Sequence, residues 1–218
     1  LVCGLFGGLF SRLLIKGSQF LSPYAKANPY RVVLLCALVL VLLGLLTGGA
    51  TYGSGYEQAS TLLDGEHPGN WSFALAKMSA TLVSYFTGIP GGLFSPSLAA
   101  GAGFGNVIGG FFPESSLVGI TLVAMAAFLA GVIQRPITSF VIVMELTGNR
   151  HDILLPLMVG AFLAAAVAKV VWARPLYDSL AERLADGRGM ALEKPRDKDD
   201  DSSAEPVSAK EPERQLPG

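Results

Sequence analysis

The chain has 218 residues, of which 51% are hydrophobic and 15% are charged, and its formal net charge is −1. In a soluble domain about a quarter of the residues are charged. This composition therefore excludes most soluble classes and favours an integral membrane protein. The balanced charge gives no reason to expect nucleic acid as a partner. Residues 1–173 carry 14 of the 33 charged side chains, whereas residues 174–218 carry 19. The sequence is therefore an apolar body followed by a polar tail.

Apolar segments follow one another along the body. Leu1–Leu14 is typical of part of a membrane helix. Val32–Leu46 is nearly solid Leu and Val, and it predicts a transmembrane helix because about 20 such residues span the hydrocarbon core. The stretch 57–70 is expected to be a loop. Further helices are predicted near residues 71–87, 94–111, 115–134, 136–147 and 153–172, with an amphipathic helix over 176–184.

The uncharged stretch 78–113 cannot be one straight helix. Gly and Pro interrupt it over residues 88–96, and these residues break a helix because Pro lacks a backbone donor and Gly costs helix stability. Irregular backbone at membrane depth is tolerated only where protein buries it or where it lines a wet cavity. Interrupted apolar segments are therefore typical of the substrate site of a transporter.

A helix that begins near Phe94 would have free backbone N–H groups in its first turn, together with the positive end of its dipole. Such a helix start binds anions without Lys or Arg. Gly91 and Gly92 would allow a ligand to approach the backbone closely. A simple packing kink explains the Gly and Pro content equally well, so the residues alone leave both interpretations open.

Three blocks in order resemble the CLC family of chloride channels and proton/chloride exchangers. Segment 92–96, GLFSP, is similar to the family's G-x-F-x-P signature. Segment 131–149, GVIQRPITSFVIVMELTGN, resembles its arginine-proline-leucine-threonine stretch and the glutamate-methionine-threonine-like ending. Segment 174–177, RPLY, resembles the start of the final helix, which carries a pore tyrosine in that family. The resemblance extends over residues 1–186.

The resemblance implies an all-α, polytopic membrane protein with short and broken transmembrane helices. This chain would be the second of two inverted repeats. Residues 1–173 would form the transmembrane half of a pore domain, residues 174–188 the final amphipathic helix with the pore tyrosine, and residues 189–218 a disordered cytoplasmic tail. The implied partners are the upstream half of the same protein, a second copy in a homodimer, the lipid bilayer and the chloride ion. No cofactor and no metal are implied.

The same resemblance implies an anion-binding set of Gly92, Leu93, Phe94 and Tyr177. The amides of Leu93 and Phe94 would contact the chloride ion, and the Tyr177 hydroxyl would point at it. A phenol hydroxyl is an uncharged donor, so it binds an anion weakly and reversibly. The family's gating glutamate and inner proton-transfer glutamate lie upstream of this chain, so the sequence favours neither a channel nor a proton-coupled exchanger.

The remaining charged and aromatic residues predict an orientation and structural roles. Glu145 is expected to be structural, near the end of a short helix, and Arg135 to be an interface or capping residue. Trp71 and Trp172 fit interfacial aromatic belts. By the positive-inside rule the tail is expected in the cytoplasm and loop 57–70 outside; the basic residues that predict this are Arg12, Lys16, Lys26, Arg31, Lys169 and Arg174. The sequence shows no counterpart of the paired regulatory domains common in eukaryotic members of the family, so the resemblance implies a prokaryotic inner membrane.

Two alternatives compete with anion transport. An intramembrane hydrolase would need a nucleophile and a base within hydrogen-bond reach. The two histidines, His67 and His151, fall in predicted loops, and the sequence has neither a Gly-x-Ser-x-Gly elbow nor a cluster with metal-ligand spacing. An enzyme is therefore not expected. A non-conducting membrane fragment of a CLC protein is the other alternative, because the first-repeat motifs are missing.

Overall fold

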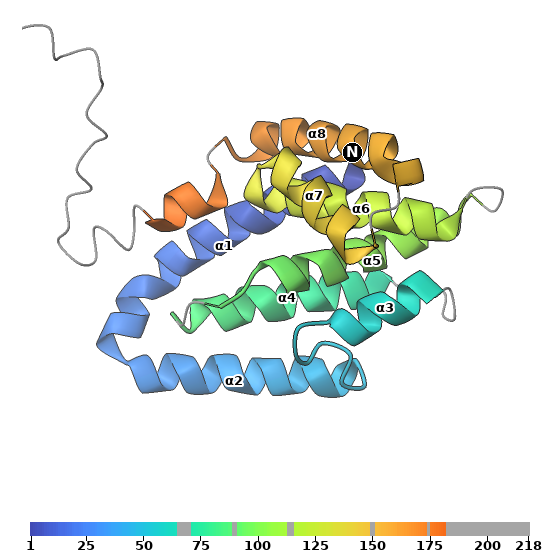
Figure 1. The fold of residues 1–218 in the computed structure, drawn as a ribbon. Coiled ribbons are helices and arrows are strands. Elements are labelled where there is room, and N and C mark those ends of the chain that lie inside the picture. Colours follow the sequence, from blue (N-terminus) through green and yellow to red (C-terminus); the bar gives the residue numbers. More distant parts are fainter. Residues whose placement is uncertain (65–70, 89–90, 113–115, 149–150, 174, 182–218) are drawn as a thin grey trace, which may run out of the picture. The chain divides into compact units, whose positions relative to one another are not determined.

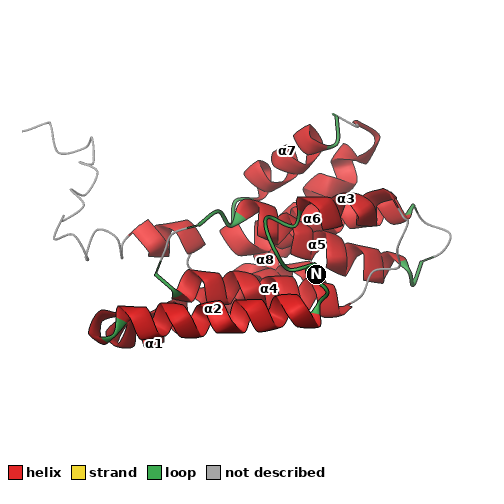
Figure 2. Ribbon diagram, turned by 90° about the horizontal axis from the view of Figure 1, so that it is seen from below, coloured by secondary structure: helices red, strands yellow, loops and turns green. Residues whose placement is uncertain are grey.

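The structure is a computed structural model that describes residues 1–64, 71–88, 91–112, 116–148, 151–173 and 175–181. Within these residues every regular element is a helix (Figure 2). The elements, shown in Figure 1, are α1 (Val2–Ala27), α2 (Pro29–Leu46), α3 (Tyr56–Asp64), α4 (Trp71–Phe86), α5 (Phe94–Gly109), α6 (Leu117–Ile133), α7 (Pro136–Leu146), the 3-10 turn η1 (His151–Ile153) and α8 (Leu154–Val171). Residues 176–181 are also helical. The predicted tail, 189–218, lies outside the described residues.

The predicted helices from residue 71 to residue 172 are confirmed, with ends that differ by about two residues or fewer. Two elements differ from expectation. Helix α1 continues well past Leu14, because Arg12 and Lys16 are exposed on one side of it while Leu14 and Ile15 are buried on the other. Helix α3 forms within the predicted loop 57–70, and it is short and amphipathic.

A single residue separates α1 from α2. Asn28 has φ −144° and ψ 73°, and Pro29 follows as the first residue of α2. A proline disfavours the helical conformation in the residue before it, and its own fixed φ suits the first turn of a helix. The chain therefore ends one helix and begins the next within one residue.

Helix α6 lies at the centre of the core and packs against α1, α5, α7 and α8. Stacked aromatic rings join three of these helices. The ring of Phe104 in α5 lies 4.8 Å from that of Phe6 in α1 and 5.7 Å from that of Phe128 in α6, measured between centroids. Trp71 meets Phe104 edge-on at 5.6 Å. Aromatic contacts of this kind bury a large apolar area with specific geometry.

Small residues allow α1 to approach its neighbours closely. A Cβ atom on Gly4 would lie 2.6 Å from the Cα of Ala164 in α8, and one on Gly7 would lie 2.8 Å from the carbonyl oxygen of Phe128 in α6. The facing Gly131 would likewise place a Cβ 3.0 Å from the carbonyl oxygen of Gly4. Small residues at helix contacts are typical of membrane bundles, in which van der Waals packing drives association.

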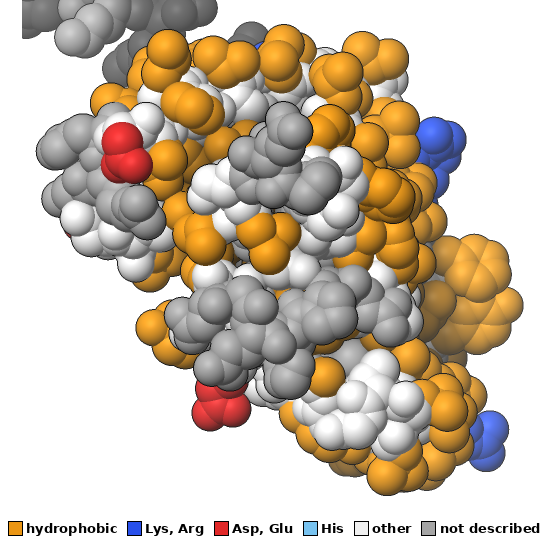
Figure 3. All heavy atoms as spheres, turned by 90° about the vertical axis from the view of Figure 1, so that its right-hand side faces the viewer, with side chains coloured by type: hydrophobic (Ala, Val, Ile, Leu, Met, Phe, Trp, Pro, Cys, Tyr) orange, Lys and Arg blue, Asp and Glu red, His pale blue; other side chains and the backbone are white. Residues whose placement is uncertain are grey.

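Apolar side chains cover much of the outer surface. Helices α2 and α8 are long and apolar enough to cross a membrane, judged by length and composition. Only Cys36 and Gly44 of α2 are buried. Figure 3 shows one face of the molecule, on which hydrophobic side chains predominate and charged ones are few. An apolar surface of this extent fits contact with lipid or with further protein rather than with water.

Substitution of Gly7 by Ala tests the close packing of α1. The added methyl group meets backbone atoms of α6 that cannot move aside as a side chain can, so we expect the free energy of unfolding to fall by about 1–3 kcal/mol, the usual cost of overpacking. Gly119→Ala is the matched control, because its Cβ would have only ordinary contacts at 3.6 Å. Thermal unfolding in detergent measures both variants. Equal melting temperatures for the two variants would contradict the prediction.

Candidate functional site

The site begins where α4 ends. The Thr87 hydroxyl donates to the carbonyl of Ser84 at 2.7 Å, and the amide of Gly88 donates to the carbonyl of Tyr85 at 3.1 Å. Gly88 has φ +81°, a left-handed conformation that favours glycine and ends helices. Residues 89–90 lie outside the described residues, and the next described residue is Gly91. The predicted break between the two helices is therefore present.

The first turn of α5 offers backbone donors. The first four N–H groups of a helix have no partner within it. Leu93 is the N-cap residue, and its apolar side chain makes no capping hydrogen bond. Pro96 has no N–H group, and the amide of Ser97 already donates to the carbonyl of Leu93 at 3.1 Å. The amides of Phe94 and Ser95 are therefore the donors of the helical first turn, at the positive end of the α5 dipole.

The predicted residues Gly92, Leu93 and Phe94 lie together at this helix start, and Tyr177 lies beside them. Leu93 is only 1% exposed, so its side chain anchors the beginning of α5 in the core. The rings of Phe94 and Tyr177 stack, with centroids 5.8 Å apart and planes inclined by 22°, and both residues are 38% exposed. Tyr177 thus comes from a distant part of the sequence to the start of α5.

Core packing and an ion pair hold the segment that carries Tyr177. The neighbouring Leu176 is fully buried. The Arg135 guanidinium lies 3.3 Å from the Asp178 carboxylate. Arg135, expected to be an interface or capping residue, is the N-cap residue of α7 without a side-chain cap, and its guanidinium instead contacts the segment that follows α8.

The junction between α6 and α7 contributes a second contact to the same segment. Gln134 closes α6 in a left-handed conformation, with φ 56°. Its side-chain amide donates to the carbonyl of Trp172 at 2.5 Å. Glu145 is exposed near the end of α7. The contacts made by Gln134 and Arg135 therefore fix the chain on either side of residue 174, which lies outside the described residues.

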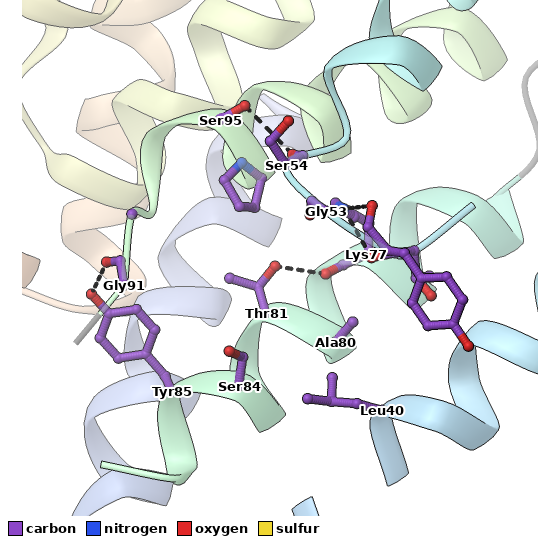
Figure 4. Close-up of a pocket in the computed structure, with 14 residues that line it drawn as sticks. Leu40, Gly53, Ser54, Lys77, Ala80, Thr81, Ser84, Tyr85, Gly91 and Ser95 are labelled. Carbon is purple, nitrogen blue, oxygen red and sulfur yellow. Dashed lines mark hydrogen bonds between the residues drawn. The ribbon is translucent and has the colours of Figure 1, made fainter. Parts of the chain in front are cut away.

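A pocket of about 490 Å³ lies against the start of α5 (Figure 4). It is lined by α4, by the loop that follows α2 and by the segment that begins at Gly91. Its polar lining is mainly hydroxyl groups, including those of Ser54, Thr81, Ser84, Tyr85 and Ser95. The pocket is therefore polar without carrying an acidic side chain among the residues that line it.

Lys77 is a residue that the sequence analysis missed. It is 1% exposed, and its ammonium group donates to the carbonyls of Thr51 at 3.0 Å, Tyr52 at 3.4 Å and Gly53 at 2.9 Å. A buried charge is costly unless other groups satisfy it, and here three backbone oxygens do so. Lys77 thereby fastens the loop after α2 to α4. The available signal was a lone charge inside the predicted helix 71–87.

Tyr85 was also not singled out from the sequence. Its hydroxyl donates to the carbonyl of Gly91 at 2.7 Å, across the break between α4 and α5 (Figure 4). Within the residues that the structure describes, no group of three or more His, Cys, Asp or Glu side chains is arranged to hold a metal ion. Apart from the ammonium of Lys77, the polar groups described at the site are amides, phenols and hydroxyls.

Comparison with known proteins identifies the family. The family model described as voltage gated chloride channel matches residues 1–169, so the chain belongs to this family. The fold is similar to that of a crystal structure of a CLC-type fluoride/proton antiporter, with a TM-score of 0.66 and 20% sequence identity. The match covers 80% of this chain and 46% of that chain, so this chain spans about half the length of the antiporter. The predicted all-α CLC-type membrane fold is confirmed.

Substitution of Lys77 by Met tests its structural role. Met keeps an apolar stem but leaves carbonyls of residues 51–53 without their donor, so we expect the free energy of unfolding to fall by about 1–3 kcal/mol. Amide hydrogen exchange in the loop after α2 should also become faster. Lys169→Met is the control, because Lys169 is exposed in the last turn of α8. Unchanged exchange in the loop of the Lys77 variant would contradict the prediction.

Proposed function

We propose that this chain forms half of a CLC-type pore that transports chloride across a membrane. The observation that carries the proposal is the stacking of Tyr177 on Phe94 at the uncapped start of α5. This contact brings an uncharged hydroxyl donor to the same place as free backbone amides. Membership of the voltage gated chloride channel family supports it independently.

The proposed mechanism follows from the kind of donors present. The amides of Leu93 and Phe94 and the hydroxyl of Tyr177 face the ion, and Gly92 allows it to approach the backbone closely. None of these groups carries a full charge. A dehydrated anion is therefore favoured enough to enter the site but is not trapped there, which is the requirement for transport.

The proposal includes the missing half of the pore. The upstream half of the same protein supplies the opposite side of the site, and two copies assemble into a homodimer with one pore in each. The exposed apolar faces of α2, α7 and α8 offer surface for lipid, for the upstream half and for the second copy. The membrane is a prokaryotic inner membrane, with the tail in the cytoplasm. Residues 1–173 form the transmembrane part, and the helical residues 176–181 belong to the final helix, of which the predicted remainder lies outside the described residues.

The first test places a carboxylate beside the proposed ion. In Phe94→Glu the negative charge lies at the helix start, and two like charges 4 Å apart repel by about 4 kcal/mol at an effective dielectric constant of 20. The protein tested is the complete native product, that is, this chain together with the proposed upstream half. We expect its chloride binding to weaken by at least about a hundredfold. Phe112→Glu is the control, since Phe112 is exposed beyond the opposite end of α5. Calorimetric titration with chloride measures both variants, and unchanged affinity of the Phe94 variant refutes the proposal.

The second test removes one donor. Tyr177→Phe keeps the ring that stacks on Phe94 but deletes the hydroxyl, so chloride affinity should fall about tenfold, the lower range for a hydrogen bond to a charged group. Tyr30→Phe, at the exposed tyrosine of α2, should leave the chloride affinity unchanged. An equal affinity in the Tyr177 variant would remove that residue from the site.

Flux measurements separate the possible activities. The complete product is reconstituted in liposomes, and chloride efflux is recorded together with external pH. Efflux accompanied by opposite proton movement identifies an exchanger, and efflux without it identifies a channel. Absence of efflux from a well-inserted product would favour the non-conducting alternative.

A further inference from the structure

We infer that the Gly92 amide is a further donor to the anion beside those of Leu93 and Phe94, and that Tyr85 is the positioning residue that sets the direction of this amide through the carbonyl of Gly91. The inference rests on the proposed function, because it concerns how the same helix start is held ready for an anion. Tyr85 belongs to the last turn of α4, whereas Gly91 and Gly92 lead into α5. The Tyr85 hydroxyl is therefore a direct connection between the two sides of the break.

The connection is a single short hydrogen bond. The Tyr85 hydroxyl donates to the carbonyl oxygen of Gly91 at 2.7 Å, and Figure 4 shows the tyrosine reaching from α4 to this carbonyl. The distance lies at the most common value for an O–H···O bond. The ring of Tyr85 is partly buried and packs against the hydrophobic core. The donor is thus held from a fixed part of the structure.

Fixing the carbonyl of Gly91 also fixes the amide of Gly92. The two groups belong to the same peptide unit, which is planar and trans, so its C=O and N–H bonds point in opposite directions. With the carbonyl turned towards Tyr85, the N–H of Gly92 must point away from Tyr85. A carbonyl that accepts a hydrogen bond also polarises its peptide unit, which makes the N–H a better donor.

The two glycines need an external restraint of this kind. Both are exposed, and a Cβ atom built on either one would meet no atom within 4 Å. Glycine has the widest backbone freedom of all residues, so packing does not select one peptide orientation here. Among residues 71–88 and 91–112, the Tyr85 hydroxyl is the group that donates a hydrogen bond to the Gly91 carbonyl. Its removal would let the peptide rotate.

Tyr85 and Tyr177 therefore have different tasks at one site. A phenol has one hydrogen to donate, and that of Tyr85 is committed to Gly91. It does not reach the anion itself. Its effect is on affinity, through the orientation of an amide, and it differs in this from the direct contact that we propose for Tyr177.

The experiment compares Tyr85→Phe with Tyr56→Phe in the complete native product. Tyr56 is exposed on α3 and serves as the matched control. Chloride dissociation constants are measured by calorimetry, and melting temperatures are measured without chloride. We expect the dissociation constant of Tyr85→Phe to rise about three- to tenfold, the range for one hydrogen bond. Its melting temperature without chloride should change little, because the ring stays in place and the Gly91 carbonyl belongs to an exposed residue, where water can replace the lost donor. The control should change in neither measurement.

The possible outcomes are distinguishable. A higher dissociation constant with an unchanged melting temperature supports the inference. An unchanged dissociation constant overturns it, and so does a lower melting temperature without loss of affinity, since that would make Tyr85 a purely structural residue. A loss of affinity accompanied by loss of helical content, measured by circular dichroism, also counts against it. If the unsubstituted protein binds no chloride, the proposed function itself fails and this inference fails with it.

Discussion

The amides at the start of α5, which have no partner within their own helix, are the constraint on which the site depends. A helix end inside an apolar protein must find partners for its free N–H groups, from side chains, water or a ligand. Here the N-cap residue, Leu93, makes no side-chain capping bond, and Pro96 removes one of the donors that would need a partner. The buried side chain of Leu93 holds this end in place against the core. The amides are thus left available at a fixed position.

Three separate parts of the chain converge on that position. Helix α4 provides Tyr85, the segment after α8 provides Tyr177, and the loop after α2 is fastened alongside by Lys77. Each of these contacts involves a backbone carbonyl or an aromatic ring rather than an acidic side chain. The resulting site is polar yet close to electrically neutral, apart from the ammonium of Lys77. This balance suits an ion that must be bound and released repeatedly.

The sequence predicted the helices best where strong local signals marked their ends. Gly88 marked the end of α4 and Pro136 the start of α7, because Gly and Pro act on the backbone directly, whereas Pro96 lies within the first turn of α5 and does not break it. Helix α3 was missed because a short amphipathic helix has little hydrophobic signal. The gathering of Phe94 and Tyr177 was expected only through family resemblance. The partners of Lys77 and Tyr85 are backbone carbonyls, which every residue has, so no residue pattern could have indicated them.

Because of the turn at Asn28, α1 and α2 should tolerate a change of one apolar side chain for another better than a change in the number of residues. A single residue separates α1 from α2, so there is no loop between them that could accommodate an insertion or deletion. One added residue in either helix would rotate everything beyond it by about 100° and shift it by about 1.5 Å. Gly4 and Gly7 would then leave the faces of α6 and α8 to which they are fitted. Natural variation in α1 and α2 should therefore consist of exchanges of one apolar residue for another, at constant length.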